Sequence, residues 1–151
     1  AALFAMVCRV NLRKIEECSS KREARNGRKD FWQDTLHNAD LLLKQSLALA
    51  QEDGFAIKDF IEGTPRGAER AIDIPLKIAR CAGEITALII RAFSESYAPV
   101  QADMECARCL AEGSREAALT VARYNLSLLN QDKRESYVKQ ISKIEQDASS
   151  S

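Results

Sequence analysis

The sequence lacks both a long apolar run and an excess of charge of one sign. No apolar stretch approaches the ~20 residues that a membrane-spanning helix needs. The 22 Lys and Arg residues balance the 22 Asp and Glu residues, so no net field favours nucleic acid or a membrane surface. A chain of 151 residues has the length of one ordinary domain. We therefore expect a single domain over residues 1–151, without a nucleic-acid or membrane partner.

Histidine is almost absent, and the cysteines do not form a framework. His37 is the single histidine, and the five cysteines are scattered through helical patterns, which indicates reduced thiols in a cytoplasmic protein. Cys106 and Cys109 share one helix face and could bind a metal or cycle as a dithiol. A zinc site needs two further ligands, however, and no second pair has metal-ligand spacing. We expect thiols without metal, with a metal or redox protein as the alternative.

Alternating strand patterns are also absent, and apolar residues recur at helical spacing through nearly the whole chain. The patterning predicts an all-α bundle of five or six helices that is able to form a dimer. The expected helices cover residues 1–18, 30–50, 53–61, 67–96, 102–129 and 131–148, with a turn at 62–67. Residues 21–29 are basic and are expected to form a solvated connector or a weak anion-binding patch.

The second of these helices carries one regular apolar stripe. Asp30 is placed to cap its start, and the apolar residues then recur at spacings of three and four. This spacing predicts a single buried stripe, formed by Trp32, Leu36, Ala39, Leu43, Leu47 and Ala50.

The segment GAERAIDIPLKIARCAGEITALII (67–90) has helical spacing with Pro75 in its middle. Proline removes a backbone donor and costs ~3 kcal/mol in a helix interior. The charged residues form one narrow stripe that includes the i,i+4 pair Asp73 and Lys77. The remainder is apolar or small, so we expect a long, Pro-kinked helix that is covered on several sides.

The helix at 102–129 is rich in small side chains. One face repeats at spacings of four and three, and a small-residue seam over 107–121 would let another backbone approach closely. The neighbouring face is small or apolar as well, which favours burial against a second subunit and predicts a homodimer. A core helix within a monomer would show the same pattern. The two faces consist of Asp103, Ala107, Ala111, Ser114, Ala118, Val121, Asn125 and Leu128, and of Cys106, Leu110, Gly113, Ala117 and Tyr124.

Residue types alone leave the chemistry open. Asp103 begins the helix at 102–129 on its apolar side, where a carboxylate also complements the helix dipole by ~0.3–1 kcal/mol. Asp53 could likewise cap a short helix, and Asn125 could be a satisfied buried amide. The sequence has no glycine-rich phosphate loop and no histidine–carboxylate pairing.

Four segments resemble the cyclodeaminase/methenyltetrahydrofolate cyclohydrolase family in their order and spacing. They are AALFAMV (1–7), EDGFAI (52–57), DIPLKIA (73–79) and ADMECARCLAEGSREAALTVARYNL (102–126). In the family, a proline- and glycine-rich segment precedes the first helix, and the resemblance implies that this sequence starts after it. Val121 stands where the family has an asparagine. The resemblance implies a single cyclodeaminase-like helical domain over residues 1–151 without its N-terminal Gly-rich segment.

The resemblance also implies folate one-carbon metabolism. The expected reaction is either conversion of formiminotetrahydrofolate to 5,10-methenyltetrahydrofolate plus ammonia, as in histidine degradation, or hydrolysis of the methenyl bridge. Neither needs a metal or redox cofactor. Asp103 is the first candidate for proton transfer and Asp53 the second, and Asn125, Arg13 and Lys14 are candidates for binding the folate substrate. The alternative is a catalytically inactive helical dimerisation module of the same fold.

Overall fold

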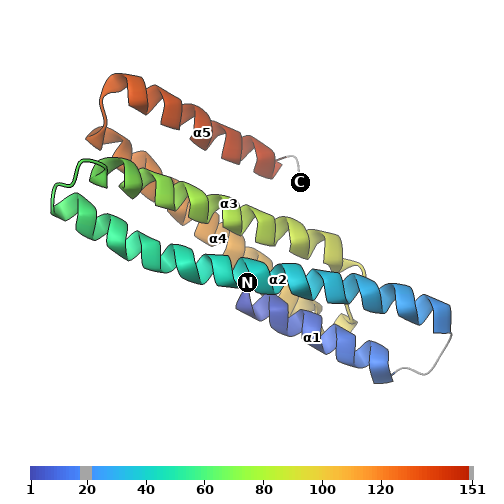
Figure 1. The fold of residues 1–151 in the computed structure, drawn as a ribbon. Helices are drawn as coiled ribbons and strands as arrows, with labels where there is room; N and C mark the ends of the chain where they lie inside the picture. Colours follow the sequence, from blue (N-terminus) through green and yellow to red (C-terminus); the bar gives the residue numbers. More distant parts are fainter. Residues whose placement is uncertain (18–21, 150–151) are drawn as a thin grey trace. The chain divides into compact units, whose positions relative to one another are not determined.

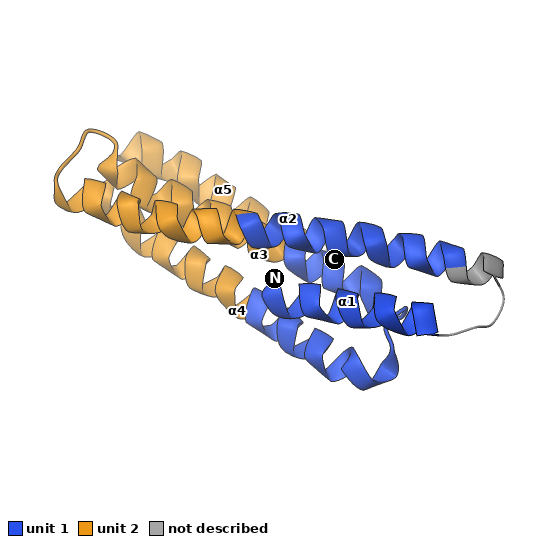
Figure 2. Ribbon diagram, turned by 60° about the horizontal axis from the view of Figure 1, so that its bottom comes forward, with its two compact units in different colours: residues 1–44, 84–111 blue, residues 45–83, 112–151 orange. Residues whose placement is uncertain are grey.

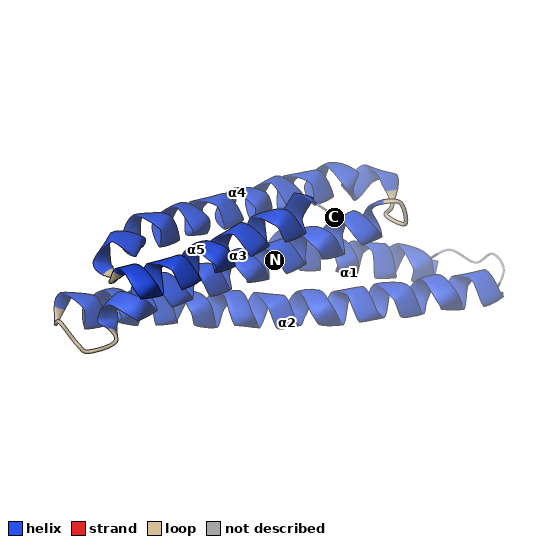
Figure 3. Cartoon of the chain, turned by 90° about the horizontal axis from the view of Figure 1, so that it is seen from above, coloured by secondary structure: helices blue, strands red, loops and turns tan. Residues whose placement is uncertain are grey.

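The computed structural model describes residues 1–17 and 22–149, and these residues are almost entirely helical (Figures 1 and 3). No strand occurs among them, which confirms the all-α prediction. The elements are α1 (Ala2–Glu17), α2 (Arg22–Ile61), α3 (Gly67–Phe93), the short 3-10 helix η1 (Ala98–Val100), α4 (Gln101–Asn125), the 3-10 helix η2 (Leu126–Leu128) and α5 (Gln131–Ser149).

The chain divides into two compact units (Figure 2). Unit 1 comprises residues 1–44 and 84–111, and unit 2 comprises residues 45–83 and 112–151. Helices α2, α3 and α4 each contribute residues to both units. The expectation of a single domain stays a prediction.

In unit 1, helix α1 presents an apolar face at spacings of three and four, as a one-sided helix should. That face includes Asn11, which is buried and whose side-chain nitrogen and oxygen both form hydrogen bonds. Its Nδ2 donates to the Val7 carbonyl at 3.0 Å and to Ser96 Oγ at 3.2 Å, and its Oδ1 accepts from the Tyr97 backbone N–H at 2.7 Å. The amide thereby ties the segment after α3 to α1. The largest fully buried side chains of unit 1 are Phe4, Val7, Cys8, Trp32, Ile89 and Met104.

In unit 2, one apolar core joins residues of α3, α4 and α5. On α5, Ile141 and Ile144 are buried and Tyr137 is half-buried, so these residues form the inward face of this helix. The buried core residues are Ile72, Leu76, Ala79, Ala118, Leu119, Ala122, Leu129, Ile141 and Ile144.

The region expected to hold a connector and two helices is one continuous helix, α2. The predicted cap at Asp30, the connector after residue 21 and the break before residue 53 are therefore wrong, although residues 18–21 lie outside the described residues. A glycine in a helix interior costs only ~1 kcal/mol relative to alanine, and no proline interrupts the segment. Local breaking signals of this strength do not end a helix whose side chains pack along its length.

The predicted buried stripe of α2 is only half correct. Trp32 and Ala39 are buried, but Leu47 and Ala50 are exposed. In unit 2 the buried positions of α2 are Leu49 and Ala56, which lie on a different side of the helix. The apolar spacing predicted the stripe, but it did not predict which neighbour, if any, covers it.

Helix α3 runs from Gly67 to Phe93 with Pro75 inside it, and most of its apolar residues are buried as predicted, although Ile90 and Phe93 near its end are exposed. The N–H of residue 75 would have bonded the carbonyl of Ala71, four residues earlier, and proline removes that donor. The side chain of Asn125 replaces it, because its Nδ2 donates to the Ala71 carbonyl at 2.7 Å. The kink itself stays a prediction.

The charged stripe of α3 pairs with other helices rather than within itself. Lys77 Nζ lies 3.6 Å from Glu52 Oε2 on α2, and Tyr137 OH on α5 donates to Asp73 Oδ1 at 2.8 Å. Asp73 and Lys77 therefore do not pair with each other as predicted, because Asp73 contacts α5 and Lys77 contacts α2.

The small-residue seam of α4 is partly used inside the chain. Ala107, Ala111 and Ala118 are buried, whereas Ser114 and Val121 are exposed. The buried members agree with the alternative interpretation of α4 as a core helix. The homodimer stays a prediction, and the buried alanines are not available as its contact surface.

Candidate functional site

Asp103 lies in the first turn of α4, directly after η1. Its side chain is half-buried, and it takes part in no hydrogen bond or ion pair within residues 1–17 and 22–149. The Asp103 carboxylate is therefore available to contact a bound molecule.

Arg13 and Lys14 belong to unit 1 together with Asp103. Both are exposed, and both pair with Glu17, at 3.2 Å from Arg13 Nε to Oε1 and at 2.6 Å from Lys14 Nζ to Oε2. The Lys14 ammonium also lies 5.8 Å from the centre of the Tyr97 ring. The two cations share the Glu17 carboxylate, and the neighbouring Glu16 pairs with Lys29 on α2 at 3.1 Å.

Asp53 and Asn125 belong to unit 2. Asp53 is half-buried on α2 and forms no hydrogen bond or ion pair among the described residues. Asn125 ends α4, and its amide already donates to the Ala71 carbonyl. Asn125 is thus a hydrogen-bonded amide, which was one of the two possibilities that the sequence allowed, and it has a role in the fold.

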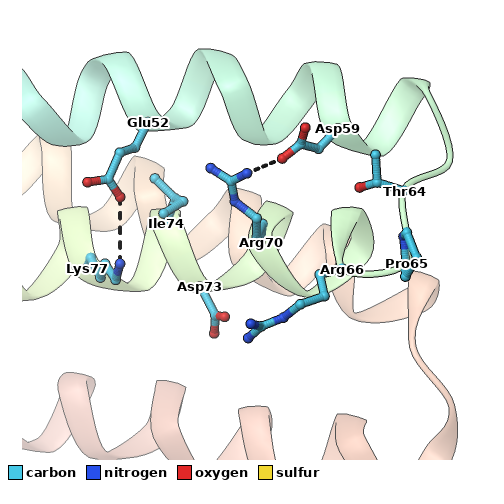
Figure 4. Close-up of a pocket in the computed structure, with 9 residues that line it drawn as sticks. All are labelled: Glu52, Asp59, Thr64, Pro65, Arg66, Arg70, Asp73, Ile74 and Lys77. Atoms are coloured by element: carbon cyan, nitrogen blue, oxygen red, sulfur yellow. Dashed lines mark hydrogen bonds and ion pairs between the residues drawn. The ribbon is translucent and has the colours of Figure 1, made fainter.

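Unit 2 also contains a pocket of about 620 Å³ between the end of α2 and the beginning of α3 (Figure 4). None of the five candidate residues predicted from the sequence lines it, although Glu52 precedes Asp53. The pocket is lined by Glu52, Asp59, Thr64, Pro65, Arg66, Arg70, Asp73, Ile74 and Lys77. Only Pro65 and Ile74 are apolar, whereas small-molecule sites are lined mainly by apolar side chains.

The charges of this pocket neutralise one another. Arg70 pairs with Asp59, and Lys77 pairs with Glu52, as the dashed lines in Figure 4 show. Burial and the hydrogen bond to Asp73 raise the pKa of Tyr137 above its usual range, so this phenol stays a neutral donor. An anionic ligand would have to displace these partners, and we regard the pocket as part of the α2–α3 contact.

The turn that closes the pocket was predicted from the sequence, and its glycines explain its shape. Gly63 has φ of +69°, a conformation that other residues rarely adopt. A Cβ atom on Gly67 would lie 2.7 Å from the Asp59 carbonyl oxygen, so only glycine fits there.

The charged residues at spacings of three and four on α3 could be identified in the sequence, but their partners on α2 could not.

The described cysteines form no disulfide, and no cluster of three or more metal-ligating side chains occurs in the described part of the chain. Cys8 and Cys81 are buried, and Cys106 and Cys109 are exposed, whereas Cys18 lies outside the described residues. No described helix is long and apolar enough to cross a membrane.

Comparison with known proteins gives one result for the family. Neither the curated proteins nor the solved structures contain a match to this chain. The family model for formiminotransferase-cyclodeaminase matches residues 1–144, which is nearly the whole sequence and includes all five candidate residues. The chain therefore belongs to the formiminotransferase-cyclodeaminase family.

Proposed function

We propose that the chain is a folate one-carbon enzyme, either a formiminotetrahydrofolate cyclodeaminase or a methenyltetrahydrofolate cyclohydrolase. The family match over residues 1–144 is the observation that carries this proposal. The half-buried carboxylate of Asp103, without a partner among the described residues, supplies a group suited to the chemistry. The proposed reaction needs no metal or redox cofactor.

In the deaminase reaction, N10 of the folate attacks the formimino carbon on N5, and the C–N bond to the leaving nitrogen breaks. The proton on N10 must leave, and the departing nitrogen must gain protons to become ammonia. In the hydrolase reaction, water adds to the methenyl carbon and one ring C–N bond opens. Both reactions require one group that accepts and returns a proton, and Asp103 takes this role. Arg13 and Lys14 are the residues that bind the glutamate tail of the folate in this proposal.

The test is Asp103→Asn, which preserves size and hydrogen bonding but cannot transfer a proton. We expect turnover to fall by ~10²–10⁴-fold while folate binding changes little. Asp132→Asn is the matched control, because Asp132 is an acidic residue in the first turn of α5. If Asp103 acts only on the helix dipole, both variants should lose a little stability and no turnover. Full turnover by Asp103→Asn, with a loss in Asp53→Asn, would transfer the role to Asp53.

A catalytically inactive dimerisation module is the second candidate. It is favoured by the engagement of Asn125 with Ala71 and of Arg13 and Lys14 with Glu17, because these groups are occupied within the fold. The two candidates differ in one measurement on the unmutated chain. Failure to bind either formimino- or methenyltetrahydrofolate would support the module, whereas a change in methenyltetrahydrofolate absorbance with turnover would support the enzyme.

A further inference from the structure

The first turns of α4 present two thiols on one exposed face. Cys106 and Cys109 are both exposed, and they lie three positions apart in an uninterrupted helix, so their side chains are neighbours. Neither thiol takes part in a hydrogen bond or ion pair with any residue that the structure describes. The proposed folate chemistry does not use them either. The pair is therefore open to a ligand from solvent.

The spacing of this pair suits a shared metal ion better than a disulfide. Met104, Ala107 and Ala111 are buried on the other side of α4 and hold the helix in place. Cβ atoms three positions apart on a helix are separated by ~5–6 Å, whereas a disulfide needs ~3.5–4.5 Å. Two sulfurs that bind one metal ion lie up to ~4.6 Å apart, which is twice a metal–sulfur bond of ~2.3 Å. A disulfide would thus deform the helix, and a bridging ion would not.

The ligand set determines which metal fits. No cluster of three or more metal-ligating side chains occurs among the described residues, so the pair has no third protein ligand there. The nearest carboxylate on this face is that of Glu105, which is engaged because Arg108 Nε donates to its Oε2 at 3.0 Å. Two thiolates are half of a tetrahedral zinc site, but they are a complete linear set for Cu(I), a soft ion that thiolates select.

The surroundings of the pair leave room for an incoming ion. Leu110, one turn after Cys106, is 66% exposed, so no described part of the chain covers this face. Ala102, one turn before Cys106, is exposed and carries only a methyl group. A Cu(I) ion carried by a small thiol compound can therefore reach the pair and transfer to it by ligand exchange.

We propose that Cys106 and Cys109 form a two-coordinate site for Cu(I), with both sulfurs bound as thiolates. Each thiol loses its proton to solvent when the ion binds, so two protons leave for each Cu(I), and the oxidation state of the metal does not change. The proposal replaces the expectation of thiols without metal for this one class of ion, and zinc stays excluded. It does not depend on the folate reaction, because neither cysteine is among the five candidate site residues.

The first experiment titrates the reduced full chain with Cu(I) without oxygen, in competition with a coloured Cu(I) chelator. Cys18, which lies outside the described residues, is replaced by serine in every protein. We expect a single Cu(I) per chain, and Cys106→Ser or Cys109→Ser should weaken binding by at least ~100-fold. Circular dichroism verifies that each variant is folded. Equal uptake by the variant that carries both substitutions, or no uptake by the chain with both cysteines, would overturn the proposal.

The second experiment tests whether the two thiols act together. In the Cys109→Ser background, Leu110→Cys restores a pair four positions apart on one face, whereas Arg108→Cys gives a pair two positions apart that does not share a face. The two proteins have the same number of cysteines. We expect the first to regain a single Cu(I) per chain and the second to bind no better than Cys109→Ser alone. Equal binding by both would show independent thiols and refute a shared site.

The third experiment determines the coordination. X-ray absorption of the loaded protein should show two sulfur neighbours around copper, and sedimentation velocity should give the same mass with and without the ion. Uptake of one Cu(I) for every two chains with a doubled mass would show that copper bridges two copies, which contradicts the proposal. Oxidised glutathione should add to each thiol separately. A Cys106–Cys109 disulfide that forms without loss of helix would refute the argument from spacing.

Discussion

At the residue scale, the side chain of Asn125 supplies to Ala71 the hydrogen bond that the backbone of residue 75 cannot. We predict that Asn125→Ala lowers the free energy of unfolding by about 1–2 kcal/mol, because it leaves a carbonyl without a donor. In a Pro75→Ala background the loss should be smaller, since the restored N–H of residue 75 can bond to Ala71. Urea unfolding of the four proteins measures this coupling.

Asn38→Ala is the control for that cycle. The Asn38 amide donates to the Asp34 carbonyl at 3.0 Å, but on an exposed part of α2 where the carbonyl is already within a regular helix. Its removal should change the free energy of unfolding by no more than ~0.5 kcal/mol. Equal losses from Asn125→Ala with and without Pro75 would contradict the compensation.

A second prediction at this scale concerns the thiol of Cys8. Burial raises its pKa to about 12, whereas a thiol in the unfolded chain ionises near 9. Between these pH values the unfolded state releases a proton that the folded state retains. The contribution of Cys8 to the free energy of unfolding is therefore fully present below pH ~9. It falls as the pH rises towards 12, by up to ~1.4 kcal/mol per pH unit. Cys8→Ala should fall less steeply over this interval in urea titrations. Parallel curves for the two proteins would show that Cys8 contributes nothing to the dependence.

The exposure of the thiols gives a third prediction. Cys106 and Cys109 should react with a thiol reagent in the folded protein at pH 8, and Cys8 and Cys81 should react only after unfolding. Mass spectrometry of labelled peptides distinguishes the sites. Protein purified without added metal should contain no stoichiometric zinc, since a pair of cysteines provides only half of a zinc site.

At the scale of elements, α5 is held to α3 by polar contacts at its exposed edge as well as by its apolar face. Tyr137 donates to Asp73, and Lys133 pairs with Glu69, which lowers the pKa of that carboxyl below its usual range. We predict that Tyr137→Phe costs about 1 kcal/mol and increases amide hydrogen exchange in α5 relative to α3. Unchanged exchange in α5 would mean that its apolar residues alone determine its docking.

The helices also show how much of the fold and of the candidate site could be predicted from the sequence. The regular apolar spacing was sufficient to predict α3, α4 and α5, because each has a stripe that its own neighbours cover. The continuity of α2 was missed, since Asp30 and Asp53 were interpreted as residues that cap new helices, and such local signals do not end a helix whose packing opposes them. Sequence placed Asp103 at the start of α4 correctly, but neither the donor to Ala71 nor the α2–α3 ion pairs could be predicted, because these contacts join residues far apart in the chain.

At the scale of the whole molecule, three helices run without interruption through both compact units. We predict that the units unfold together, because unwinding a shared helix in one unit removes backbone hydrogen bonds at the start of the other. Trp32, the only tryptophan, is fully buried in unit 1 and reports on it. Ile141→Ala in unit 2 should destabilise by ~2–4 kcal/mol and shift the Trp32 fluorescence transition by the same amount as the circular dichroism transition. A Trp32 transition that stays in place would show two independent units.

The hydrogen bond between Asn125 and Ala71 also constrains how this sequence can vary. It joins residues 54 positions apart and is needed only while residue 75 is proline. A relative that loses the proline is free to lose the amide, whereas one that retains the proline must keep a donor at position 125 or offer another. Substitutions at positions 75 and 125 should therefore occur together across the family, and a comparison of aligned members would detect this covariation even though the two residues do not pair with each other directly.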